Sequence, residues 1–276
     1  MQIAVSSWSF HAPLYAGQLE LSDVPLAAFE LGVRLVELND RFLKPSPPRG
    51  LARLWGAKPA QGSGPDYGRE SLLRLRHKRL RSGTRLVCWT IDTDLTREAE
   101  EERSAQRAYI GTAIEAARFL GAPILRLTLG GESGDRAALG RATDLLRSVA
   151  PVAIASGVRL AIENHGGLSS DLGTLEEVVG AFGVKQVGVC LDVSHFREGE
   201  HAEGMRRLAP LAIHVHAMAC AFDANGEETS IDYGMSLTAL REAGYAGAIS
   251  IEYGGDGDPR EGILKAKTLI EKHWAS

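Results

Sequence analysis

The feature that most constrains the fold of this chain is a regular alternation of short β-branched runs with longer segments of helical periodicity. Eight short runs predict strands at 3–7, 34–39, 85–91, 124–129, 159–164, 187–192, 211–216 and 248–253. Segments of helical spacing follow them, near 23–31, 69–82, 97–120, 135–156, 174–182, 201–208, 235–243 and 259–274. A strand followed by a helix eight times is typical of a closed parallel barrel. The sequence therefore predicts an α/β protein, a single (β/α)8 TIM barrel spanning residues 1–276.

Glycines and prolines mark the boundaries of these elements. Six glycines each follow a helical pattern, where a left-handed residue is commonly needed: Gly32, Gly83, Gly121, Gly157, Gly183 and Gly244. The main irregularity is the Pro- and Gly-rich segment 41–68, which carries five of the chain's 11 prolines. It follows a strand and so belongs to the face where barrel enzymes hold their catalytic residues. A loop of this length is either a functional lid, which we favour, or a disordered insertion.

Composition excludes several classes of protein. The 276 residues are 44% hydrophobic and 24% charged, as in ordinary globular proteins, and the net charge of −4 argues against nucleic-acid binding. The basic run at 74–81 is interpreted as a solvated outer helix rather than a polyanion site. Cys88, Cys190 and Cys220 have no C-x-x-C spacing and predict packed thiols without disulfides. No apolar run is long enough for a membrane span and the start resembles no signal peptide, so a cytoplasmic protein is expected.

Strand parity predicts a polar pocket inside the barrel. In the last four strands bulky aliphatic residues alternate with small or polar ones, as Ile213 and Val215 do with His214 and His216. The aliphatic face must pack against the surrounding helices, so the small and polar face points into the barrel. Barrel interiors are ordinarily filled by branched side chains, so small residues below ionisable ones predict a pocket.

An ionisable residue lies at or near the end of each of these strands: Glu163, Asp192, His216 and Glu252. All four therefore reach the C-terminal rim of the barrel. Four separate buried ionisable groups would be costly, and three unpaired carboxylates would repel one another, whereas a divalent cation resolves both problems. The oxygen-rich set suits one Mn²⁺ best, with Mg²⁺, Co²⁺ and Zn²⁺ as alternatives. Separate hydrogen bonds from each residue to a loop are the other interpretation.

Several motifs resemble the xylose-isomerase-like TIM-barrel superfamily, most strongly from about 120 to 275. They are IENHGG at 162–167, GVCLDVSHF at 188–196, HVHAM at 214–218 and LREAGYAGAISIEYGG at 240–255. The superfamily includes sugar isomerases and epimerases, inosose dehydratase and the apurinic-site endonucleases. In its ketose epimerases a Glu, an Asp, a His and a second Glu at the ends of strands 5 to 8 hold the metal. These positions fall on the four residues that parity selects, and the resemblance implies that Glu163 and Glu252 also act as acid and base.

The predicted activity is metal-dependent isomerisation or epimerisation of a small sugar, keto-sugar or polyol derivative. A cation that binds a carbonyl acidifies the adjoining C–H, and Glu163 and Glu252 stand at opposite ends of the ligand arc. An inosose dehydratase-type lyase and a non-catalytic sugar-binding barrel remain alternatives. Xylose isomerase proper is disfavoured because Asn164 and His165 stand where that enzyme carries a Lys. An apurinic-site endonuclease is disfavoured because its additional zinc-binding histidines are not evident.

The expected partner is a small sugar, without nucleic acid or membrane, and a homo-oligomer is left open. The residues expected to contact the sugar are His195, His165, Glu37, Asn39 and Trp8. Each has a structural alternative: a loop hydrogen bond for the histidines, a loop anchor for the strand-2 residues, and core packing for the tryptophan. His214 is interpreted as a core or supporting hydrogen-bonding residue. Arg126 is expected to pair with a carboxylate inside the barrel, with phosphate binding as the alternative.

Overall fold

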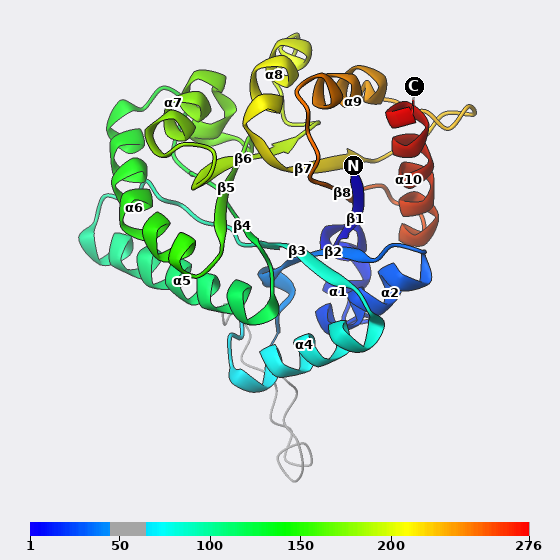
Figure 1. The fold of residues 1–276 in the computed structure, drawn as a ribbon, viewed down its shortest axis with the longest axis horizontal. Coiled ribbons are helices and arrows are strands. Elements are labelled where there is room, and N and C mark those ends of the chain that lie inside the picture. The colour runs from blue at the N-terminus through cyan, green and yellow to red at the C-terminus, as the bar shows by residue number, and fades with distance from the viewer. Residues whose placement is uncertain (45–64, 276) are drawn as a thin grey trace.

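The eight predicted strands close into one parallel barrel in which β1 pairs with both β2 and β8 (Figure 1). This computed structural model describes residues 1–44 and 65–275. The strands are β1 (Gln2–Ser6), β2 (Leu35–Asn39), β3 (Arg85–Thr90), β4 (Ile124–Leu127), β5 (Arg159–Glu163), β6 (Val187–Asp192), β7 (Ala212–Ala219) and β8 (Ala248–Tyr253). The predicted (β/α)8 class is confirmed.

The helices form a ring around the barrel (Figure 1). They are α1 (His11–Tyr15), α2 (Val24–Glu30), α4 (Arg69–Ser82), α5 (Glu100–Leu120), α6 (Arg136–Ala155), α7 (Leu172–Phe182), α8 (His201–Leu208), α9 (Tyr233–Glu242) and α10 (Pro259–Ala275). Short 3-10 turns are η1 (Ser7–Phe10), η2 (Leu21–Asp23), η3 (Asp40–Phe42), η4 (Gly167–Ser170) and η5 (Ala209–Leu211). All eight predicted helices are present, and the predicted boundary glycines all have positive φ. None of the helices within the described ranges is long and apolar enough to span a bilayer.

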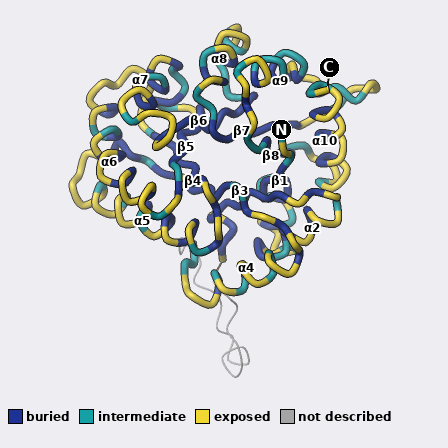
Figure 2. The backbone as a smooth tube through the Cα atoms, in the orientation of Figure 1, coloured by how far each residue is buried: buried dark blue, intermediate teal, exposed yellow. Residues whose placement is uncertain are grey.

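Burial follows the layers of the barrel (Figure 2): the strands are buried, and the helices are exposed on their outer faces. The aliphatic faces of the strands pack with the helices into the main core, in which Leu160, Val189 and Ile249 are fully buried. Burying a side chain of this size contributes roughly 1.5–3 kcal/mol. The three cysteines are free, as predicted, but Cys220 is exposed because it follows the last residue of β7 instead of packing within a strand.

Strand β7 departs from the predicted alternation at one residue. The register between β6 and β7 shifts so that His214 lies opposite Cys190, and Ile213 becomes the extra residue of a bulge. Ile213 packs with Cys190 in a small cluster separate from the main core, whereas the sequence predicts that it faces the helices. Gly188 provides the space, because a Cβ there would lie 2.6 Å from Ile213 Cγ2. Above the bulge, His216 keeps its predicted inward orientation.

The predicted lid segment 41–68 lies mostly outside the described residues, which include only 41–44 and 65–68 of it. The backbone N–H of Asp66 donates to the carbonyl of Leu43 at 2.8 Å and joins these two ends. Beside them Asp40 is buried, and its Oδ2 accepts hydrogen bonds from the hydroxyls of Tyr67 and Tyr109, both at 2.6 Å. Burial raises the pKa of Asp40 from 3.8 to about 6, although the tyrosine hydrogen bonds oppose the shift.

Asp40→Asn is expected to raise the free energy of unfolding, relative to the unmodified chain, by more at pH 8 than at pH 4. An acid whose pKa is raised on folding contributes stability below its unfolded pKa, and this contribution is lost as the pH rises through the folded value. The shift corresponds to about 3 kcal/mol between pH 4 and pH 8. Asn keeps an oxygen acceptor for both tyrosines and stays neutral throughout. Urea unfolding at both pH values measures this, with exposed Asp144→Asn on α6 as the control, and a pH-independent effect of Asp40→Asn contradicts the prediction.

Candidate active site

The four predicted ligands converge on one point, Nδ1 of His216. Glu163 Oε1 lies 2.8 Å from this nitrogen, Glu252 Oε2 3.6 Å and Asp192 Oδ2 4.0 Å. All four side chains are buried. Glu163 and Asp192 are the last residues of β5 and β6, and Glu252 is the last but one of β8. His216 was predicted at the end of its strand, but β7 continues to Ala219, three residues further. The geometry has one imidazole nitrogen facing three carboxylate oxygens.

Neighbouring polar groups orient these carboxylates. Ser6 Oγ donates to Glu252 Oε1 at 2.8 Å. The backbone N–H and hydroxyl of Ser194 both donate to Asp192 Oδ1 at 2.6 Å, while Asp192 Oδ2 is buried with no hydrogen-bond partner among the described residues. The side chain of Asn164 fixes the backbone, because it accepts from Asp192 N–H at 2.7 Å and donates to the carbonyls of Asp192 and His195. An unpartnered buried carboxylate oxygen beside an imidazole nitrogen is a donor set that fits a divalent cation.

The surroundings of Glu163 and Glu252 give these two glutamates different pKa values. Burial opposes ionisation of Glu163, but the charges of Arg126 and His216 lower its pKa to about 2. Burial raises the pKa of Glu252 to about 7, and His216 only partly offsets this effect. Burial disfavours the charged form of His216, yet Cys190 and then the surrounding carboxylates raise its pKa well above the usual value. The same carboxylates that favour a proton at Nδ1 would favour a divalent cation there, in competition with that proton.

Glu37, at the middle of β2, lies below this cluster and is fully buried. Its Oε1 lies 2.9 Å from His216 Nε2 and accepts from the Thr90 hydroxyl at 2.7 Å, and its Oε2 lies 2.5 Å from His214 Nε2. The hydroxyl of Ser250 also contacts His214 Nε2, at 3.1 Å. The charges and hydrogen bonds of the two histidines hold the pKa of Glu37 well below its usual range despite its burial. Every oxygen of this carboxylate is therefore engaged by the protein.

A cavity of about 250 Å³ opens above the cluster. Its walls are Trp8, Asn39, Arg41, Asp92, Arg126, Glu163, His165, His195, Met218 and Glu252. Six of the predicted site residues therefore line it, whereas Asp192, His216 and Glu37 lie beneath. His165 and His195 stand edge to face with ring centroids 4.5 Å apart, and burial lowers the pKa of His165. The side chain of Asn39 accepts from Arg41 N–H at 3.0 Å and thus anchors the following turn.

A chain of ion pairs along the cavity wall was not predicted from the sequence, except for its first member. Arg126 Nη2 lies 2.7 Å from Glu163 Oε2, which confirms that this arginine pairs with a carboxylate inside the barrel. Arg126 Nη1 also contacts Asp92 Oδ1 at 3.0 Å, and Asp92 pairs in turn with Arg41. The guanidinium of Arg41 lies over the ring of Trp8, 5.3 Å from its centroid. Both arginines of the cavity are thus already paired. Arg41 closely follows β2, and Arg126 lies on the inward face of β4. These positions are the sequence signal that could have identified both residues as part of the cavity wall.

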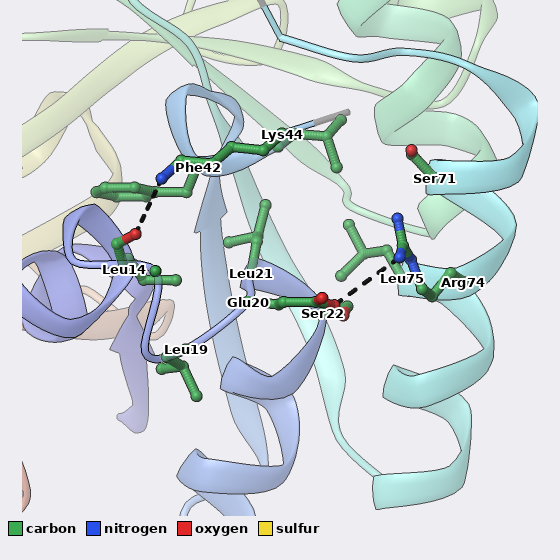
Figure 3. Close-up of a pocket in the computed structure, with 12 residues that line it drawn as sticks. Leu14, Leu19, Glu20, Leu21, Ser22, Phe42, Lys44, Ser71, Arg74 and Leu75 are labelled. Carbon is green, nitrogen blue, oxygen red and sulfur yellow. Dashed lines mark hydrogen bonds and ion pairs between the residues drawn. The ribbon is translucent and has the colours of Figure 1, made fainter. Parts of the chain in front are cut away.

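A second cavity, of about 180 Å³, lies outside the barrel between η2, α4 and the end of η3 (Figure 3). Its walls are mainly aliphatic, including Leu14, Leu21 and Leu75. Its charged groups are engaged locally, since Lys44 Nζ donates to the carbonyl of Leu14 at 3.1 Å and Arg74 lies 3.9 Å from Glu20. This cavity lacks the grouped acids and imidazoles of the barrel mouth.

Comparison with known families agrees with the geometry. Residues 27–273 match the family described as xylose isomerase-like TIM barrel. The chain belongs to this family. Among curated proteins, this chain is similar to the alpha subunit of a 3'-dehydrocarminate deglycosidase from Microbacterium sp., with 39% identity over 56 residues. That match covers 20% of this chain and only 16% of the relative.

Solved structures share the whole fold of this xylose isomerase-like TIM barrel at low sequence identity. D-psicose 3-epimerase in the presence of D-fructose is similar with a TM-score of 0.74 and 16% identity, covering 100% of both chains. The IolI protein with a bound zinc atom is similar with a TM-score of 0.73 and 16% identity, covering 100% of this chain and 98% of the other. At this level of identity the likeness shows the fold alone.

Proposed function

We propose that this protein is a divalent-metal-dependent isomerase or epimerase of a small sugar, keto-sugar or polyol derivative. The observation that carries the proposal is the convergence of Glu163, Asp192 and Glu252 within 4.0 Å of His216 Nδ1, directly below a cavity lined by two of these carboxylates. The fold shared with a sugar epimerase supports the same conclusion.

The proposed ligands of one cation are Glu163, Asp192, His216 and Glu252. We propose Mn²⁺ because three carboxylates form a hard, oxygen-rich set, with Mg²⁺, Co²⁺ and Zn²⁺ as alternatives. The zinc bound by the structurally similar IolI protein supports a divalent ion but does not select manganese. When bound, the cation would polarise the carbonyl of the substrate and stabilise the negative charge that develops on it.

The two glutamates are the proposed proton-transfer groups. They come from β5 and β8, which are separated around the barrel by β6 and β7, so they approach the cavity from different sides. Arg126 holds Glu163 as a carboxylate, whereas burial gives Glu252 a pKa of about 7. Without a cation, a carboxyl group with this pKa both accepts and donates a proton near neutral pH. Epimerisation needs an acid and a base on opposite faces of one carbon, and the approach of the two glutamates from different sides supports this role.

The walls of the cavity suit a polyhydroxylated molecule. His165 and His195 offer ring nitrogens, Asn39 lies at its edge, and Trp8 provides an aromatic surface held by Arg41. Since Arg41 and Arg126 are both paired with carboxylates, we propose an uncharged sugar rather than a phosphorylated one.

The test is incorporation of solvent deuterium next to the substrate carbonyl. Mn²⁺-loaded protein is incubated in D2O with a panel of ketoses and inososes, and products are followed by NMR and mass spectrometry. Exchange at that carbon with no change in composition identifies an isomerase or epimerase, and recovery of a stereoisomer or an aldose distinguishes the two. Loss of one water identifies the dehydratase-type lyase. Metal-independent sugar binding without any exchange supports the non-catalytic barrel instead.

Glu37 was predicted to contact the sugar, and its placement leads us to propose a different role, that of orienting His216. Because Oε1 of Glu37 engages Nε2 of His216, it directs Nδ1 towards the three carboxylates. Glu37→Gln is expected to weaken Mn²⁺ binding by about 10- to 100-fold. Calorimetric titration measures the effect, with exposed Glu261→Gln on α10 as the matched control. If Glu37 instead contacts substrate, metal affinity stays unchanged and only KM rises.

A further inference from the structure

The N-terminal mouth of the barrel holds a cavity of about 530 Å³ at the opposite ends of the strands from the candidate active site. Its walls include Gln2, Arg85, Arg159 and Ala248, which are the first residues of β1, β3, β5 and β8. Arg79 joins them from the last turn of α4. We call this space the basal cavity. Its volume falls within the range of small-molecule sites.

Three arginines therefore border the basal cavity, and no carboxylate of the described residues lines it. No described carboxylate forms an ion pair with Arg79, Arg85 or Arg159. Within the described residues, the side-chain hydrogen bonds of Arg79 and Arg85 go to neutral acceptors: Arg79 Nη1 donates to the carbonyl of Thr84 at 2.9 Å, and Arg85 Nη2 to Gln2 Oε1 at 3.3 Å. Four arginines on the outer helices instead pair with an acid three residues away: Arg103, Arg118, Arg147 and Arg206.

Arg79 carries a further indication that a counter-ion belongs here. Its Nε is buried without a hydrogen-bond partner among the described residues. Burial and the neighbouring charge of Arg76 lower the pKa of Arg79, as expected for a guanidinium that lacks a nearby anion. In a chain with a net charge of −4, a concave group of three unpaired arginines is a local excess of positive charge.

The inner wall of the cavity lies against the buried interior. His214 forms part of its wall and is fully buried, with Nδ1 unpartnered among the described residues. The other ring nitrogen of His214 contacts Glu37, which in turn contacts His216. The basal cavity thus lies against the floor of the barrel.

We propose that the basal cavity is a binding site for a small oxyanion of two or more negative charges, bound by Arg79, Arg85 and Arg159. Guanidinium groups donate paired hydrogen bonds that match the oxygens of phosphate and carboxylate groups. The position at the far mouth makes this ligand distinct from the substrate. Free phosphate and the phosphate group of an ester share the chemistry that these arginines recognise.

The test is calorimetric titration of inorganic phosphate and of glycerol phosphate into the full chain, after treatment with a chelator and at low ionic strength. Saturable 1:1 binding is expected. The Arg85→Gln/Arg159→Gln double variant is expected to bind at least about tenfold more weakly, because each charge-assisted hydrogen bond contributes about that factor or more. Arg147→Gln on α6 is the matched control and is expected to bind within about twofold of the unmodified chain.

The relative affinities of the two probes identify the kind of anion that the basal cavity binds. Tighter binding of glycerol phosphate than of phosphate assigns the site to an ester, and equal affinities assign it to the free anion. No saturable binding of either probe overturns the proposal. Equal binding by the double variant also overturns it, because the anion then occupies another place, such as the histidines of the candidate active site. If the double variant fails to fold, as judged by its melting temperature, Arg159→Gln alone gives the same comparison.

Discussion

Glu252→Gln is expected to reduce deuterium exchange at the substrate by about 10³-fold or more while leaving measurable Mn²⁺ binding. Glu252 lines the cavity, its Oε1 accepts from Ser6 Oγ and its Oε2 faces His216 Nδ1. The amide has nearly the same shape and keeps an oxygen for Ser6, but it cannot carry the proton. Three of the four proposed ligands remain, so metal affinity falls without being abolished.

The measurement pairs exchange rates at saturating Mn²⁺ with calorimetric metal titration of the same preparation. Glu261→Gln, an exposed glutamate in the first turn of α10, makes the same chemical change far from the cavity and is expected to leave both quantities unchanged. Retained turnover in Glu252→Gln refutes the acid–base assignment. Loss of all metal binding together with activity shows that Glu252 is needed as a ligand and leaves proton transfer to be assigned to another group.

The proposed ligands were predictable because strand parity is a local property. Side chains of a regular strand alternate between its two faces. Once the aliphatic residues are assigned to the outward face, the residues between them must face inward. Glu163, Asp192 and Glu252 lie at strand ends, and the alternation alone places them at one rim. The same reasoning failed for Ile213, because a bulge adds one residue and reverses the alternation locally.

The parts that could not be predicted depend on contacts between distant segments. The pairing of Asp92 with both Arg41 and Arg126 depends on where the turns after β2 and β3 lie in space. Nothing in the strand pattern specifies this. Likewise, parity places Glu37 inside the barrel but does not reveal that His214 and His216 occupy its carboxylate. Inward orientation can be derived from sequence, whereas the partner of an inward group needs the three-dimensional arrangement.

Asp192→Asn is expected to weaken Mn²⁺ binding by at least about 100-fold, more than a supporting residue such as Glu37 would. Ser194 donates two hydrogen bonds to Asp192 Oδ1, and the oxygen of an amide can accept both, so the local turn is retained. The amide nitrogen then replaces Oδ2, the unpartnered oxygen that faces His216. An amide nitrogen donates hydrogen bonds and does not ligate a cation, and the variant also removes a negative charge that lies near the carboxylate of Glu163.

These two effects have opposite consequences for stability, which makes the prediction specific. Without metal, Asp192→Asn is expected to melt at or above the temperature of the unmodified chain, because like-charge repulsion is reduced. With Mn²⁺ at concentrations that saturate the unmodified chain, a 100-fold weaker affinity removes about 2.7 kcal/mol of ligand stabilisation, or about 5 °C in melting temperature. Thermal unfolding with and without Mn²⁺ measures both, and exposed Asp256→Asn, in the turn after β8, controls for charge near the rim. Equal stabilisation of the Asp192 variant and the unmodified chain by Mn²⁺ would place the cation somewhere other than beside His216, and the proposed chemistry would lose its foundation.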